Sequence, residues 1–420
     1  MSTIMLAVST TDSFRDLKCL LEESADDLDD EHKIPFKVRE RAHKLCSGFL
    51  GGSWKTLDVQ SMRLSRIKGG MTNMLFLCRL PDNVKVKHSE PHQVLLRVYF
   101  NPETESHLVS ESVIFTLLSE RHLGPRLYGI FNGGRLEEFI PSRPLCCKEI
   151  AQHAFSMKIA QRLARIHQLD VPISKDPDYI CEALTRWIHQ LICIADERRG
   201  ESPMQLINGK LDSPDRDNSG SYSNQTLMSE LQVLKKSIAR SSSAIVFCHN
   251  DLQEGNILLP LASSGNIRHM SVTDETSHLR VPTTARLVVI DFEYASYNYR
   301  AFDFANHFCE WTFDYDPPNG EHPGFIHTPA AFPNEQQQRD FFRSYLVSCG
   351  VHDIDDRKLG SMMAETDAFV AVSHFFWGVW ALLQVEVSPV EFGFQEYAEK
   401  RLGLYFDTRP RLIALNSENP

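Results

Sequence analysis

The sequence has no block of Lys or Arg residues, and its formal net charge over 420 residues is −11 at pH 7. Surfaces that bind nucleic acid or anionic lipid concentrate positive charge, so the sequence argues against both of these partners. An acidic balance instead suits a cationic small substrate, although net charge alone is weak evidence for one.

The sequence also has no CxxC pair and no regular cysteine framework, although ten cysteines are present. In a chain of this length, that pattern predicts reduced thiols in an intracellular protein. The N-terminal apolar run IMLAV follows no basic segment and is too short for a signal peptide. The longest apolar stretch, Phe375 to Leu383, is far below the roughly 20 residues that span a bilayer. We therefore expect a soluble, cytoplasmic protein without a membrane span.

Composition and polarity divide the chain. With 42% hydrophobic residues, it can bury one large core or two lobes. Residues 1–33 are polar and acidic and predict a solvated arm. Two polar stretches, residues 199–226 and 261–285, predict inserts or loops. The residues after Asp407, 408–420, predict a frayed end.

Periodicity gives a coarse secondary structure. Alternating apolar residues between 58 and 100 predict strands, and a helix is predicted before them, from Pro35 to Leu50. Later apolar residues recur at helical spacing and predict helices at Phe155–Ile166, Asp178–Ala195 and Leu227–Ser237.

The stretch VFCHNDLQEGNILL, residues 246–259, carries the strongest chemical signal. Asp251 follows a short apolar run, with Asn256 five residues later, and Asp291 ends a second apolar run. Phosphoryl transfer to a hydroxyl uses a carboxylate to accept the proton, and an amide oxygen plus a second carboxylate to hold magnesium on ATP. We assign Asp251, Asn256 and Asp291 these three roles. The alternative is an ordinary loop with an Asx turn.

Residues near this set have less certain roles. His249 is assigned a structural role, because a histidine beside a catalytic Asp more often bonds to the backbone than transfers protons. Asp303 is expected to brace the loop backbone. Glu293 is left open between a magnesium ligand and a structural carboxylate.

A turn between the predicted strands contains glycines whose backbone N–H groups can approach phosphate oxygens. The alternative is a plain hairpin turn. Arg97, on the following strand, stands where kinases usually keep a lysine for the phosphates, and its guanidinium offers bidentate contacts. Glu111, in the next predicted helix, is the expected partner of Arg97. The candidate phosphate-binding residues of the turn are Gly69, Gly70, Thr72 and Asn73.

The strings CHNDLQEGNILL, VVIDFEYASYNYRAFDFANHFCEW and HFFWGVWALLQ resemble the choline kinase family, part of the choline/ethanolamine kinase group. The resemblance covers roughly residues 67–406. It implies an α+β, two-lobed, protein-kinase-like fold, with a small N-terminal antiparallel sheet lobe near residues 34–140 and a larger, mostly helical lobe at 141–407. It also implies ATP and Mg²⁺ as cofactors, binding between the lobes, and a homodimer.

The activity that the resemblance implies is ATP-dependent phosphorylation of choline to phosphocholine, the first step of phosphatidylcholine synthesis, with weaker activity on ethanolamine. It supports Arg97 as a phosphate ligand. It also places the backbone of Glu138 and Ile140 against adenine.

An aromatic set after Asp303 predicts the acceptor. Trp377 and Trp380 are three residues apart on a predicted helix, so both rings share one face. A quaternary ammonium binds to aromatic faces and a nearby carboxylate, although paired tryptophans are more often core. The resemblance favours the cage, and Trp311 is assigned to packing. The predicted choline-binding residues are Glu310, Tyr315, Trp377, Trp380, Phe392 and Tyr397.

Two alternatives stay open. Another small-alcohol or aminoglycoside phosphotransferase would keep the HND motif and the metal-binding Asp but not the tryptophan pair. A non-catalytic binding protein of the same shape would be expected to lack Asp251, Asn256 or Asp291, yet all three are present. The sequence leaves open the preference between choline and ethanolamine, and the roles of the arm and the inserts.

Overall fold

The computed structural model describes residues 34–67, 73–86, 90–99, 105–197, 224–261, 286–317, 320, 322–388, 390 and 392–415, with the side chains of the first helical turn at 105–108 excluded. The chain divides into two compact units, residues 1–142 and 143–420, so the division lies two residues beyond the predicted boundary. The predicted arm, most of both inserts, and Gly69, Gly70 and Thr72 of the phosphate turn lie outside the described residues.

Unit 1 is built on a five-stranded antiparallel sheet with the order β1-β2-β3-β5-β4. This sheet confirms the predicted small antiparallel lobe. Its strands are β1 (Arg63–Ile67), β2 (Asn73–Arg79), β3 (Gln93–Tyr99), β4 (Leu127–Phe131) and β5 (Gly134–Glu138).

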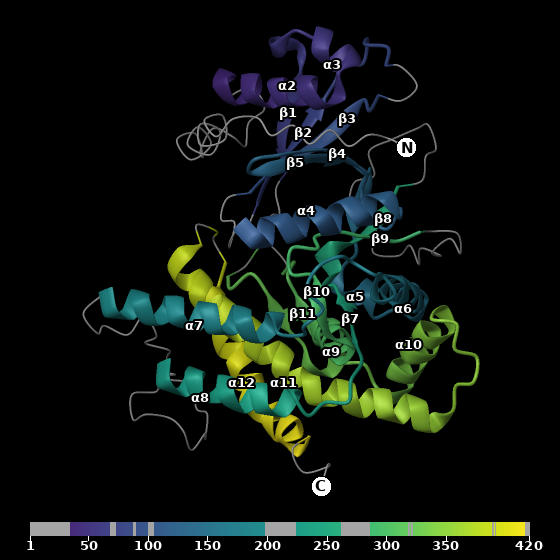
Figure 1. The fold of residues 1–420 in the computed structure, drawn as a ribbon, viewed down its shortest axis with the longest axis vertical. Coiled ribbons are helices and arrows are strands. Elements are labelled where there is room, and N and C mark those ends of the chain that lie inside the picture. The colour runs from purple at the N-terminus through teal and green to yellow at the C-terminus, as the bar shows by residue number, and fades with distance from the viewer. Residues whose placement is uncertain are drawn as a thin grey trace. The chain divides into compact units, whose positions relative to one another are not determined.

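The two faces of this sheet differ because side chains alternate along each strand. Val94, Leu96 and Val98 are buried in an apolar core shared with α2 (Phe36–Leu50). The intervening Arg97 points to the other face, as does its cross-strand partner Arg135. Figure 1 shows α2 and α3 (Gly52–Thr56) on one side of the sheet and α4 (Glu105–Glu120) on the other. The predicted helix at 35–50 is confirmed, starting at Phe36.

Unit 2 is largely helical, as predicted, and its strands are short. Strands pair as β7 (Ile245–Cys248) with β10 (Ser296–Tyr299), and as β11 (Phe313–Asp314) with β12 (Ile326–His327). A further sheet has the order β6-β8-β9, with β6 (Ser142–Pro144), β8 (Ile257–Pro260) and β9 (Val288–Val289). The helices are α5 (Cys147–Ile150), α6 (His153–His167), α7 (Tyr179–Glu197), α8 (Asn224–Ile238), α9 (Arg300–Glu310), α10 (Glu335–Ser348), α11 (Asp356–Val387) and α12 (Phe394–Ala414). The three helices predicted from periodicity in this part of the chain are confirmed as α6, α7 and α8.

Helix α11 is the apolar centre of unit 2. Among the described residues, α11 is the one helix that is long enough and apolar enough to cross a membrane, by length and composition only. Its most apolar stretch has a mean hydropathy of 1.6. However, 89% of that stretch is buried inside the fold. Phe375, Phe376 and Leu382 lie in one core cluster with side chains of α7, α9 and α12. Such burial is the arrangement of a core helix.

The end of the chain differs from its prediction. Helix α12 continues to Ala414, so the expectation of a frayed end after Asp407 is wrong for residues 408–414. Leu412 is buried, and Arg409 Nε donates to Glu230 Oε2 on α8 at 2.6 Å. Contacts with a residue 179 positions earlier in the chain, on α8, hold this segment. Local sequence carries no trace of such contacts.

Candidate active site

The loop after β7 carries the predicted catalytic residues and is held by backbone contacts. Asn250 and Asp291 both have positive φ, 67° and 63°. Residues other than glycine adopt this conformation at a cost, so it persists where surrounding contacts impose it. The Ile290 N–H donates to the Asn256 carbonyl at 3.0 Å. The end of the strand before Asp291 is thereby fixed to the catalytic loop.

Asp303 anchors the loop, as predicted. Its carboxylate accepts from the backbone N–H groups of His249 (2.8 Å) and Asn250 (2.6 Å). His167 Nε2 lies 2.9 Å from its Oδ2. Burial alone would raise the pKa of Asp303, but the hydrogen bond and charge of His167 lower it below its usual value.

His249 contacts backbone on both sides. Its Nε2 lies 2.9 Å from the Ile290 carbonyl, and the Asp251 N–H donates to its Nδ1 at 3.2 Å. This arrangement requires the neutral ring with its proton on Nε2. Burial lowers the pKa of His249 below its usual value, which favours the same state. These contacts support the structural role predicted for His249.

Asp251 and Asn256 contact each other directly. Asn256 Nδ2 donates to Asp251 Oδ2 at 2.8 Å and to the Asp251 carbonyl at 2.9 Å. Burial raises the pKa of Asp251 well above its usual value, and the charges of Glu310, Glu293 and Asp291 add to the rise. The predicted acidic residues therefore converge on one place within unit 2.

The donor set at this place fits magnesium. With its amide nitrogen directed at Asp251, the Asn256 side chain presents its oxygen elsewhere. Asp291 and Glu293 add carboxylate oxygens close enough to act electrostatically on Asp251. Hard oxygen ligands of this kind are what Mg²⁺ binds.

The predicted aromatic residues form a continuous cluster in unit 2. The rings of Trp377 and Trp380 are 5.5 Å apart and meet edge to face at 81°. Phe392 lies 5.8 Å from Tyr397 and 6.4 Å from Tyr315. Trp377 and Trp380 are 6% and 8% exposed. Trp311 is buried and donates to His307 Nε2 at 3.2 Å, in keeping with its assignment to packing.

Glu310 lies in this cluster, but its charge is already matched. It forms an ion pair with the fully buried Arg401 of α12. Arg401 Nη2 also donates to the Tyr397 hydroxyl at 2.7 Å, and the Tyr315 hydroxyl donates to Glu310 Oε2 at 2.8 Å. The guanidinium lies 3.9 Å from the centroid of the Phe313 ring. Sequence reasoning missed Arg401, which lies in an ordinary helical segment.

Asn306 is a second residue that the sequence did not reveal. Its Oδ1 accepts from Trp377 Nε1 at 2.7 Å, and its Nδ2 donates to the Asn250 carbonyl at 3.3 Å. Asn306 therefore joins the tryptophan pair to the catalytic loop. Its position on α9, between Asp303 and Glu310, was the available signal.

Glu254 is a third residue that the sequence did not reveal. It lies three residues after Asp251 and begins the 3₁₀ helix Glu254–Asn256. It is 7% exposed, and its Oε2 has no hydrogen-bond partner. Burial, and then the charge of Glu310, raises the pKa of Glu254 to about 8.

In unit 1, the predicted pairing of Arg97 with Glu111 is wrong. Arg97 Nε lies 3.4 Å from Glu137 Oε1, whereas Glu111 pairs with Arg135 at 2.5 Å. The cause is register: Arg135 sits opposite Arg97 on the neighbouring strand, and Glu137 lies two residues further on that strand, on the same face. Burial opposes ionisation of Glu137, but the two arginines lower its pKa below the usual value.

The other nucleotide-binding candidates of unit 1 occupy strand ends. Asn73 begins β2 opposite Tyr99. The Glu138 N–H donates to the Arg126 carbonyl at 2.8 Å, so this amide is already bonded at the end of β5. The Ile140 carbonyl accepts from the Ser142 hydroxyl at 2.8 Å.

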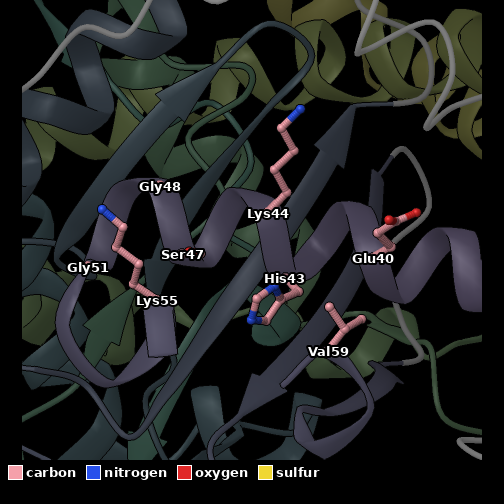
Figure 2. Close-up of a pocket in the computed structure, with 8 residues that line it drawn as sticks. All are labelled: Glu40, His43, Lys44, Ser47, Gly48, Gly51, Lys55 and Val59. Carbon is pink, nitrogen blue, oxygen red and sulfur yellow. The ribbon is translucent and has the colours of Figure 1, made fainter. Parts of the chain in front are cut away.

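Unit 1 also has a cavity of about 560 Å³ beside α2, away from these residues. Figure 2 shows that its charged side chains point in different directions and do not converge on one spot. None of the predicted site residues lines it. The lining residues are Glu40, His43, Lys44, Ser47, Gly48, Gly51, Lys55 and Val59.

Comparison with known proteins extends the resemblance seen in the sequence. The choline/ethanolamine kinase family matches residues 64–406. The chain is 55% identical to choline kinase A2 of Caenorhabditis elegans over 413 residues, which cover 96% of this chain and 93% of that protein. It is 36% identical to the human choline/ethanolamine kinase, covering 91% of this chain and 89% of the other.

Solved structures give the fold independently. An ethanolamine kinase from Plasmodium vivax superposes with a TM-score of 0.66 at 21% identity, covering 97% of this chain and 99% of the other. At this identity the likeness bears on the fold alone. It confirms the predicted kinase-like fold, with an antiparallel sheet in the N-terminal part and a largely helical C-terminal part.

Proposed function

The chain belongs to the choline/ethanolamine kinase family, and we propose that it is a choline kinase that transfers the γ-phosphoryl group of ATP to the hydroxyl of choline. The observation that carries this proposal is the juxtaposition found in unit 2. There the Asp251–Asn256 pair is bonded through Asn250 and Asn306 to the tryptophan pair. A phosphoryl-transfer loop and an aromatic pocket are thus parts of one hydrogen-bonded structure.

In the proposed reaction Asp251 accepts the hydroxyl proton of the acceptor. Its raised pKa, caused by burial and by neighbouring carboxylates, describes the protein without bound cations. Since phosphoryl transfer depends mainly on positioning and charge neutralisation, the bond from Asn256 matters as much as base strength. That bond fixes the carboxylate of Asp251 in one orientation.

Magnesium is the proposed cofactor besides ATP. Asn256, Asp291 and Glu293 would hold it, and the bound ion would neutralise charge on the phosphate oxygens. In unit 1, Arg97 would contact phosphate oxygens of ATP through its planar guanidinium. Glu137 orients that guanidinium.

The acceptor is proposed to be choline first, with ethanolamine as a weaker substrate. Trimethylammonium cannot donate an N–H hydrogen bond and is held by aromatic faces. The cluster around Trp377, Trp380 and Tyr397 offers several such rings. A homodimer and a cytoplasmic location stay predictions, which the family likeness and the sequence pattern suggest.

The experiment is an ADP-release assay with ATP, Mg²⁺ and three acceptors in parallel: choline, ethanolamine and an aminoglycoside. The proposal predicts strong turnover with choline, weaker turnover with ethanolamine and none above background with the aminoglycoside. Preferred turnover of the aminoglycoside would identify the alternative phosphotransferase. No turnover with any acceptor, from folded protein that binds ATP, would favour the non-catalytic alternative.

A further inference from the structure

Side chains on one face of α9 hold the backbone of the catalytic loop. The Asp303 carboxylate accepts from the Asn250 N–H at 2.6 Å, and Asn306 Nδ2 donates to the Asn250 carbonyl at 3.3 Å. One residue further along the helix, His307 Nδ1 lies 2.9 Å from the Leu252 carbonyl. Residues three and four apart share one face of a helix. The three side chains together therefore fix the backbone on both sides of the proposed base.

Asn306 also reaches the aromatic cluster. Its side chain is fully buried, and its Oδ1 accepts from Trp377 Nε1 at 2.7 Å and from the Ser373 hydroxyl at 2.8 Å, both on α11. An indole nitrogen can only donate, so the amide oxygen of Asn306 has to face Trp377. The amide nitrogen is thereby turned toward the Asn250 carbonyl. The tryptophan thus sets the orientation of an amide group that acts on the loop.

The contact with Asn250 bears directly on the position of Asp251. The Asn250 carbonyl belongs to the peptide group that joins these two residues. The N–H of the same peptide group donates to His249 Nδ1 at 3.2 Å, at the long end of the usual range. Asn250 has a φ of 67°, which costs energy in a residue other than glycine and persists where contacts impose it. Losing the bond from Asn306 should let this peptide group rotate, and small displacements of a catalytic group lower the rate of transfer.

We propose that Asn306 is a positioning residue that couples the acceptor pocket to the catalytic loop. The N–H of Trp377 orients the amide of Asn306, and that amide fixes the peptide group before Asp251. The inference rests on the proposed function and deepens it, because it assigns the ring of Trp377 to acceptor binding and its N–H to the rate of phosphoryl transfer. Asn306 acts through the backbone of the loop and not on the substrate.

The two parts of Trp377 can be separated by substitution. Trp377→Phe keeps an aromatic face for the cation and removes the N–H of the side chain. Loss of binding alone raises KM, whereas loss of an interaction made only in the transition state lowers kcat. In Trp377→Phe, kcat for choline should therefore fall about fivefold, the range expected for one buried hydrogen bond. The KM for choline should change by less than about twofold.

A double-mutant cycle tests whether the two residues act together. Asn306→Ala removes the link itself, and its kcat should fall about tenfold. In the double variant Trp377→Phe/Asn306→Ala, kcat should also be about tenfold below wild type, because both substitutions break the same chain of contacts. Independent effects would multiply to about fiftyfold. That result, or a raised KM with unchanged kcat in Trp377→Phe, would overturn the proposal.

Thr366→Val is the matched control on α11. The Thr366 hydroxyl is buried and donates to the Met362 carbonyl of the same helix at 2.7 Å. Its loss removes a hydrogen bond within α11, and kcat and KM should stay within about twofold of wild type. A fall in kcat as large as that of Trp377→Phe would show that any change in α11 slows turnover, and would overturn the proposal.

Thermal melting of each variant establishes that it is folded. If Asn306→Ala does not fold, the kcat and KM of the conservative variant Trp377→Phe decide the question. If wild-type protein fails to phosphorylate choline, the proposed function fails. If wild-type protein succeeds and Trp377→Phe loses affinity for choline instead of rate, this inference alone fails.

Discussion

Arg135 in unit 1 and Arg401 in unit 2 are buried arginines in similar settings. In unit 1, Arg135 bonds to Glu111 and Glu137 at 2.5 Å and to the Tyr99 hydroxyl at 2.8 Å, with its guanidinium 3.9 Å from the centroid of Phe115. In unit 2, Arg401 pairs with Glu310, bonds to tyrosine hydroxyls and lies 3.9 Å from the centroid of Phe313. The local chemistry of the two networks is almost the same.

The charge balance of the two networks differs. In unit 1, Arg97 joins Arg135, so two arginines face Glu111 and Glu137. In unit 2, Arg401 pairs with Glu310, while Asp251 and Glu254 lie close enough for their charges to interact with that of Glu310. We infer that the matched charges of unit 1 fix the orientation of Arg97. The surplus of carboxyl groups in unit 2, whose pKa values are raised by burial and by neighbouring carboxylates, marks the place where cations bind.

The largest effect is expected for Asp251→Ala. It removes the proposed base but no part of the Arg401 network, so turnover should fall at least about a thousandfold. ATP binding and thermal stability should stay near wild type. Steady-state ADP release, with ATP binding followed by calorimetry, measures both. Unchanged turnover would refute the role of Asp251.

Breaking either arginine network should cost stability. Arg401→Met leaves Glu310 buried without its partner, and Arg135→Met leaves Glu111 in the same state. Each should lower the free energy of unfolding by about 3–5 kcal/mol. Denaturant unfolding measures the loss.

A matched control isolates the charge. Adding Glu310→Gln to Arg401→Met removes the stranded carboxylate and should restore part of the stability. If the double variant is no more stable than Arg401→Met, the loss arises from packing, and the comparison between the two networks loses its electrostatic basis.

Trp380→Ala tests the aromatic wall next to the surplus charge. The KM for choline should rise about tenfold or more, because one cation–π face is lost, while the KM for ATP changes by less than about twofold. Trp380→Phe keeps an aromatic face, so its KM for choline should lie between those of wild-type protein and Trp380→Ala. Equal effects on both KM values would refute a role in acceptor binding.

Acidification should affect the stability of the two units at different pH values, with a smaller effect than the substitutions above. Burial lowers the pKa of His307, in unit 2, to about 4. Its unfolded value is about 6.5, so on acidification the unfolded chain takes up the proton first. The contribution of His307 to the stability of unit 2 is complete above pH 6.5 and declines toward pH 4. In unit 1, the pKa of Glu137 is lowered, so its contribution to stability persists until the pH falls below about 4.5.

Between pH 7 and 5.5 unit 2 should therefore lose about 1 kcal/mol from His307. Tryptophan fluorescence during denaturant unfolding follows unit 2 well, because four of the five tryptophans lie there. His307→Asn should flatten the dependence. The raised pKa values of Asp251 and Glu254 act on the wild-type midpoint in the opposite direction, so the test is the difference between the two proteins. Equal pH dependence of wild-type protein and His307→Asn would contradict the assignment of a buried neutral histidine.

Much of the fold was readable from sequence because its signals are local. Apolar spacing gave α2, α6, α7 and α8 to within a few residues, and the catalytic loop follows its strand as predicted. The ion pairs of Arg401 and Arg409 were not readable, because their partners lie 91 and 179 residues away. No periodicity reports which acidic residue will meet a distant arginine.

The same limit explains the wrong partner for Arg97. Helical spacing offered Glu111 as a candidate, but the choice was made by strand register, which places Arg135 and Glu137 beside Arg97. It also explains why the sequence offered no partner for Glu310. Its partner Arg401 lies 91 residues further along the chain, on α12, and joins that helix to Glu310 on α9.

The most direct test of the surplus-charge account is one ratio measured on wild-type protein: kcat/KM for choline divided by kcat/KM for 3,3-dimethylbutan-1-ol. The two alcohols have the same shape and differ in charge. The account predicts a ratio of about a hundred or more, because aromatic faces with several carboxyl groups nearby favour the cation. A ratio near one would show that the pocket recognises shape alone and would contradict the account.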